Sequence, residues 1–235
     1  MRLSPLFLIA ALVACAPVVD DAGPQVVPLQ PQTTGPQVSQ AQSLRNFRTA
    51  AQRIEPVAET VCRRRDPSVN CDFNILIDNR SKEINAYQTL DRSGRPIIAF
   101  TVPMIAEARN VDEIAFVMAH EAAHHIEGHL ARQRANATVG AVLLGGLAGA
   151  LGTTDQASID TAQQLGAGLG ARTYSKNFEL EADALGTRIA AAAGFDPLRG
   201  AQFFFRIPDP GDRFLGTHPA NADRLRTVQR VAAGL

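Results

Sequence analysis

The spacing of hydrophobic residues predicts that most of this chain is helical. Between residues 44 and 65, apolar side chains recur every three or four positions, which is the spacing of one face of an α-helix. Similar patterns, bounded by capping residues, glycine or proline, predict a long helix over 111–134 and further helices over 178–193, 201–206 and 220–233.

Three short stretches have the composition of β-strands instead. Residues 73–77, 84–89 and 96–102 are rich in Ile, Val, Phe or Tyr and are separated by polar turns. We predict that they form a small three-stranded antiparallel sheet, with 96–102 at its edge. The fold class is therefore α+β: a mainly helical domain whose sheet packs on the helix over 111–134.

The first residues have the pattern of an export signal. Arg2 precedes an apolar run over 6–14, which is shorter than the roughly 20 residues that a membrane span needs. The run ends in Leu-Val-Ala-Cys and resembles a bacterial lipobox, so residues 1–15 are interpreted as a lipoprotein signal peptide in which Cys15 is lipidated. The alternative is an ordinary cleaved signal peptide. Because Ala16 follows the cysteine, we expect an anchor in the outer membrane, facing the periplasm.

The next segment has no apolar periodicity. Residues 16–43 contain five prolines among many Gln, Ser and Thr residues, a composition that predicts a disordered tether. The folded domain is then expected over 44–235. Within it, Cys62 and Cys71 are expected to form a disulfide in an oxidising compartment, with two free buried thiols as the alternative.

Charge and cysteine content exclude two classes of protein. The chain has 23 basic and 23 acidic residues. Binding to nucleic acid requires a basic excess, so no nucleic-acid partner is expected. Three cysteines are too few for a disulfide-based scaffold.

Two stretches, 137–152 and 157–171, are rich in Gly and Ala and contain Gly-xxx-Gly patterns. Both are too short and too interrupted by glycine to be convincing membrane spans. We favour close packing of two helices that are intrinsically weak. A hairpin that touches a membrane and a mobile cover over a site are the alternatives.

The pentapeptide His120-Glu121-Ala-Ala-His124 indicates metal chemistry. Residues four apart lie on the same face of a helix, so the two imidazoles can bind one metal ion. Glu121 is placed beside that face and can take a proton from a water bound to zinc.

A catalytic zinc needs a third protein ligand and an open position. Position 130 is Leu rather than a third His, so we expect a carboxylate from another helix. Glu179 and Asp183 are four apart and share a face; one can bind the metal while the other orients a ligating histidine. Glu181 is on a different face and is expected to be a solvated charge.

Two more histidines follow the pentapeptide. His125 and His129 are expected to point away from the ligand pair or to lie further along the helix. We interpret them as structural or as supporting a ligand.

The pentapeptide and residues 177–186 (Asn-Phe-Glu-Leu-Glu-Ala-Asp-Ala-Leu-Gly) together resemble the HtpX/Oma/CAAX-prenyl-protease family of zinc metallopeptidases, of gluzincin type. The resemblance is strongest to periplasmic, single-domain, BepA-like lipoproteins. It covers about residues 73–225. Supporting segments are 84–87, 112–115, 217–219 and 224–225.

The resemblance implies a zincin-like domain and one Zn²⁺ per chain. The implied metal ligands are His120, His124 and Glu179, with Glu121 as the catalytic acid/base and Asp183 as a support. His218 matches a histidine that approaches the metal in this family, either to stabilise an oxyanion or to act as a latch. A histidine before a proline in a loop is more often a turn residue.

These expectations combine into a zinc-dependent endopeptidase of the cell envelope, with Glu121 as general acid/base and a zinc-activated water. The family implies a role in protein quality control, with unfolded or misassembled envelope proteins as substrates. Such a substrate would add to the strand over 96–102. One alternative is a latent or non-proteolytic, zinc-containing chaperone or assembly adaptor. Another is a zinc hydrolase that acts on cell-wall peptides.

Overall fold

A computed structural model gives the arrangement of the chain. It describes residue 31 and residues 36–173, 175–206 and 221–235. The predicted signal peptide with Cys15, most of the predicted tether, and His218 lie outside the described residues.

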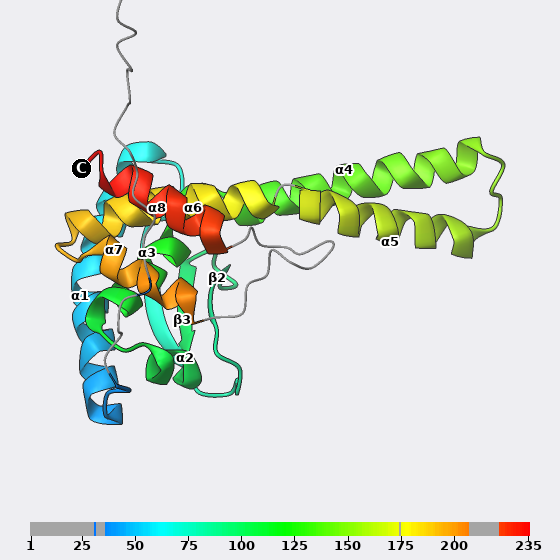
Figure 1. Ribbon diagram of the computed structural model, residues 1–235. Coiled ribbons are helices and arrows are strands. Elements are labelled where there is room, and N and C mark those ends of the chain that lie inside the picture. The colour runs from blue at the N-terminus through cyan, green and yellow to red at the C-terminus, as the bar shows by residue number, and fades with distance from the viewer. Residues whose placement is uncertain (1–30, 32–35, 174, 207–220) are drawn as a thin grey trace, which may run out of the picture.

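Helices predominate in the described part of the chain, and a small sheet accompanies them, so the α+β class is confirmed (Figure 1). The helices are α1 (Gln40–Arg65), α2 (Val102–Glu107), α3 (Val111–Ile126), α4 (His129–Ala150), α5 (Gln156–Thr173), α6 (Ser175–Ala192), α7 (Pro197–Gly200), the 3-10 helix η1 (Ala201–Phe205) and α8 (Asn221–Ala232). The strands are β1 (Asn74–Asp78), β2 (Ala86–Leu90) and β3 (Pro96–Thr101).

The sheet differs from the prediction in two ways. Its strand order is β1-β3-β2, with β3 parallel to β1 and antiparallel to β2, so the sheet is mixed. The strand near 96–102 is central rather than at the edge. Five of the six residues of β3 are buried, as is typical of a strand covered on both faces, and strand composition does not encode this order.

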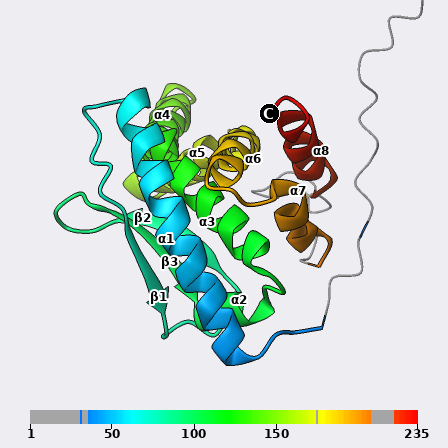
Figure 2. The ribbon, with the colours of Figure 1, turned by 90° about the vertical axis from the view of Figure 1, so that its left-hand side faces the viewer.

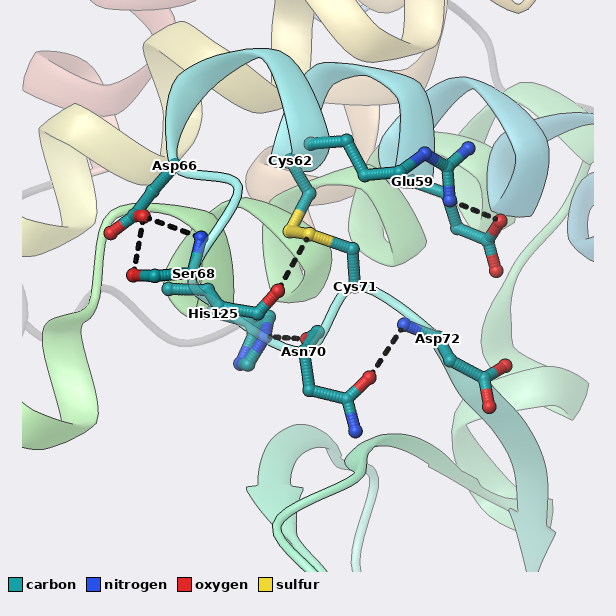
Figure 3. Close-up of a disulfide and its surroundings, with 10 residues drawn as sticks. Glu59, Cys62, Asp66, Ser68, Asn70, Cys71, Asp72 and His125 are labelled. Atoms are coloured by element: carbon teal, nitrogen blue, oxygen red, sulfur yellow. Dashed lines mark hydrogen bonds and ion pairs between the residues drawn. A yellow bond between two sulfur atoms is a disulfide. The ribbon is translucent and has the colours of Figure 1, made fainter.

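Helix α1 closes one side of the domain and is tied to the start of the sheet. Its buried face includes Phe47 and Ile54. At its end, a disulfide joins Cys62 to Cys71, the pair that the sequence analysis expected (Figure 3). The bond connects the last turn of α1 to the segment that leads into β1.

Helix α3 is at the centre of the domain. Helices α1, α6 and α7 and strands β2 and β3 all pack against it (Figure 2). Its first turn is capped by Asn110, whose side chain accepts a hydrogen bond from the Glu113 backbone N–H at 3.0 Å. The carboxylate of Glu113 is buried and paired with Arg206 at the end of η1.

The prediction of a single helix over 111–134 is wrong. The helix is interrupted between α3 and α4 at Gly128. The φ of Gly128 is 66°, in the left-handed region that favours glycine. In an unbroken helix, His124 and His129 would point about 140° apart. The break instead brings their rings together, with centroids 4.9 Å apart.

Helices α4 and α5 form a hairpin that projects from the body of the domain, which we call the arm (Figure 1). A Cβ on Gly166 would lie 2.1 Å from the carbonyl oxygen of Gly140, so only glycine allows the two helices to approach this closely. The composition of residues 137–152 and 157–171 predicts this close packing of two helices. Among the described residues, no helix has both the length and the apolar character of a membrane span.

Candidate metal centre

Two helices bring three ligand-type side chains together. His120 and His124 project from α3, and Glu179 projects from α6. The Nε2 atoms of the two histidines are 3.0 Å apart. Glu179 Oε2 lies 3.4 Å from His120 Nε2, and Glu179 Oε1 lies 3.3 Å from His124 Nε2. These are the three residues that the sequence analysis assigned to the metal.

The arrangement fits a metal ion. Ligand atoms about 2.0–2.2 Å from a tetrahedral metal lie about 3.3–3.6 Å from one another, close to the separations here. Two imidazoles and one carboxylate are also a ligand set of catalytic zinc sites. The same three residues offer ligand atoms that all lie within 4.8 Å of one another.

His120 is held in place by a buried carboxylate. Its Nδ1 lies 2.9 Å from Asp183 Oδ1, which leaves Nε2 for the metal position. Burial opposes the protonated form of His120, but hydrogen bonds to Asp183 and Glu179 outweigh it and raise the pKa of the ring to about 10. A ligand must be deprotonated, so metal binding here would release this proton.

Arg224 on α8 completes this network, and the sequence analysis assigned it no role. Its Nε and Nη2 each donate to Asp183 at 2.7 Å. Burial opposes ionisation of Asp183, but the charge of Arg224 outweighs it and lowers the pKa of the carboxyl. A buried arginine 41 residues away from its partner leaves no local pattern in the sequence that would reveal the pair.

A glycine sets the distance between the two site helices. A Cβ on Gly186 would lie only 3.0 Å from the backbone of His120. Gly186 is three positions after Asp183 and seven after Glu179, so all three face α3. The close approach places both carboxylates against the histidines.

Glu121 lies at a cleft of about 680 Å³ next to the three ligands. The cleft is lined by residues 84–88 on and beside β2, by the start of α4 and by Arg224. Burial raises the pKa of Glu121, and the nearby His124 and His120 oppose this shift. A raised pKa makes the carboxylate of Glu121 a better proton acceptor, which is what a general base requires.

His125 and His129, the two histidines that follow the pentapeptide, have different surroundings. His125 faces the disulfide loop, with Nε2 2.7 Å from the carbonyl oxygen of Asn70 (Figure 3). His129 is buried instead against the ligand His124, with their Nδ1 atoms 2.8 Å apart. Burial lowers the pKa of His129 to about 4, which keeps the ring neutral.

Glu181 is not simply a solvated charge, as the sequence analysis expected. Its Oε2 accepts a hydrogen bond from Arg132 at 2.6 Å and lies 3.1 Å from His129 Nε2. These partners are on α4, which reaches Glu181 only because of the break at Gly128. The sequence pattern, interpreted as one straight helix, hides this contact.

Comparison with known proteins gives the family of the chain. Residues 46–232 match Peptidase family M48. A beta-barrel assembly-enhancing protease of Vibrio cholerae is 34% identical over 161 residues, which are 62% of this chain and 32% of the relative. The match thus spans about a third of the relative's length. The chain belongs to peptidase family M48.

Proposed function

We propose that this member of peptidase family M48 is a zinc-dependent endopeptidase of the cell envelope that cleaves unfolded or misassembled proteins. The observation that carries the proposal is the convergence of His120, His124 and Glu179 beside Glu121 in an open cleft. The relative's name, which refers to β-barrel assembly, supports an envelope role. The pattern of residues 1–15 and the disulfide are in keeping with an exported protein.

The side chains of the site have distinct tasks in peptide hydrolysis. Zinc, when bound, would supply the Lewis acidity that polarises a scissile carbonyl and makes water acidic. Glu121 takes the proton of the attacking water and delivers it to the amine nitrogen as the C–N bond breaks. Asp183 holds His120 in the orientation that presents Nε2.

Strand β2 is the proposed docking edge for the substrate, in place of the strand over 96–102. In the described sheet β2 pairs with β3 alone, and residues 84–88 line the cleft. An extended peptide can pair with the free backbone groups of such an edge. Recognition through the backbone favours loose sequence preference, which suits unfolded chains.

The direct test is the Glu121→Gln substitution in the full chain, purified in detergent and loaded with Zn²⁺. We expect cleavage of casein to fall about 10²–10⁴-fold or more, with zinc content unchanged. A chelator should abolish wild-type cleavage, and added Zn²⁺ should restore it. Undiminished cleavage by the Gln variant would contradict the mechanism. A zinc-loaded wild type that cleaves nothing would favour a non-proteolytic adaptor.

The metal assignment has its own test. Glu179→Ala should remove most of the bound zinc, because it deletes one of three protein ligands. Glu59→Ala, at a partly exposed ion pair on α1, is the matched control and should keep one zinc per chain. Equal zinc content in the two variants would refute Glu179 as a ligand.

A further inference from the structure

We propose that His129 and Glu181 are positioning residues that fix the tautomer and orientation of the ligand His124. This inference rests on the proposed metal site and adds residues that the zinc motif does not include. Neither residue reaches the metal position itself. Their effect on the metal passes entirely through the ring of His124.

The proton on each ring follows from the contacts. A neutral imidazole has one N–H and one lone pair. His124 Nε2 faces His120 and Glu179, so its lone pair must point there when a metal is bound, and its proton is on Nδ1. That Nδ1–H donates to His129 Nδ1 at 2.8 Å.

The second ring continues the chain. Because His129 Nδ1 accepts from His124, the proton of His129 is on Nε2. It donates to Glu181 Oε2 at 3.1 Å. Glu181 is fixed in turn by Arg132, whose Nη1 donates at 2.6 Å. In this order of donors and acceptors every nitrogen of both rings has its partner.

The ring of His129 has little freedom to turn away. Its exposure is 4%, and it stacks on Phe178, with ring centroids 4.6 Å apart and planes inclined by 12°. The guanidinium carbon of Arg132 lies 4.3 Å from the centroid of the same Phe178 ring. Packing therefore holds the imidazole that in turn holds the ligand.

The two ligating histidines then have equivalent supports. His120 is held by a carboxylate, Asp183, which is paired with an arginine, Arg224. His124 is also supported by a carboxylate paired with an arginine, Glu181 with Arg132, but the imidazole of His129 lies between His124 and that carboxylate. Supports of this kind contribute to metal affinity because they reduce the cost of orienting the ligand.

The test measures the affinity of the full chain for Zn²⁺ by competition with a chromophoric chelator. His129→Leu should weaken zinc binding about 10–100-fold. His129→Gln should restore most of it, because an amide can accept from His124 and donate to Glu181. His125→Gln is the matched control on the neighbouring residue and should bind zinc like the wild type.

Glu181→Leu tests the outer end of the chain and does not alter the buried ring. It should weaken zinc binding in the wild type but have no further effect in the His129→Leu background. Additive effects would overturn the proposal, as would wild-type affinity in a folded His129→Leu variant or equal weakness of the Gln and Leu variants. Failure of the wild type to bind zinc would instead overturn the proposed function, and this inference with it.

Discussion

The metal centre and the arm differ in how their helices are packed. At the centre, α3 is enclosed by neighbours, and its polar groups are buried with partners: Asp183 has no exposed surface and contacts both His120 and Arg224. In the arm, α4 and α5 chiefly contact each other, and leucines remain exposed, among them Leu143 at 66% and Leu151 at 78%.

The two regions also differ in their content of charged residues. Residues 135–154 contain no Asp, Glu, Lys or Arg, whereas the centre concentrates charged groups in its interior. One helix joins the two environments, because α4 starts at the buried His129 and ends near the exposed Leu151. Enclosure therefore separates the two regions. At the centre, buried partners fix the geometry of side chains, whereas in the arm close packing fixes mainly the distance between two backbones.

The strongest contrast is expected for charged residues. Asp183→Ala leaves Arg224 buried without its main partner and should lower the free energy of unfolding by about 3–5 kcal/mol. Asp160→Ala, on the exposed side of α5, should change it by less than about 0.5 kcal/mol. Urea denaturation of the two variants measures both values. Similar losses would show that the arm is as tightly coupled to the fold as the centre.

Apolar truncation should give the next largest contrast. Ile189 is fully buried on α6, so Ile189→Ala should cost about 3 kcal/mol through lost contacts and a residual cavity. Leu147 is 53% exposed on the arm, and Leu147→Ala should cost less than about 0.5 kcal/mol. A large loss for Leu147→Ala in the same denaturation assay would mean that something covers this face in solution.

Two glycines of α5, Gly166 and Gly168, differ in how closely they pack. A Cβ on Gly166 meets the backbone of Gly140, so Gly166→Ala should destabilise the arm by about 1–3 kcal/mol. A Cβ on Gly168 meets nothing within 4 Å, so Gly168→Ala should stabilise α5 by up to about 1 kcal/mol. Hydrogen exchange of arm amides should speed up in the first variant and slow down in the second. Equal responses would contradict the close packing at Gly166.

Much of the site could be predicted because its key signals are local. Histidines four apart on one helix already share a face, and Glu179 and Asp183 share a face for the same reason. The pairing of Cys62 with Cys71 needed only a short separation in the chain. In each case the residues are close in the sequence, so secondary structure alone brings them close together in space.

The errors have the opposite character. The predictions of a single helix over 111–134 and of a solvated Glu181 are wrong for one reason: the backbone conformation of Gly128 redirects α4. The prediction of an antiparallel sheet is wrong because strand composition indicates which residues are extended but not which strands are neighbours. No pattern in the sequence near Arg224 indicates that its partner is Asp183, 41 residues away.

The helical scaffold, the ligand face of α3 and the carboxylate face of α6 are encoded locally in the amino-acid sequence, because they depend on periodicities of a few residues. Three features depend on long-range packing instead: the position of β3 between β1 and β2, the pairing of Arg224 with Asp183, and the contact of His129 with His124. Those contacts depend on how whole elements pack, and the packing energy that selects one arrangement is shared among many residues distant in the chain.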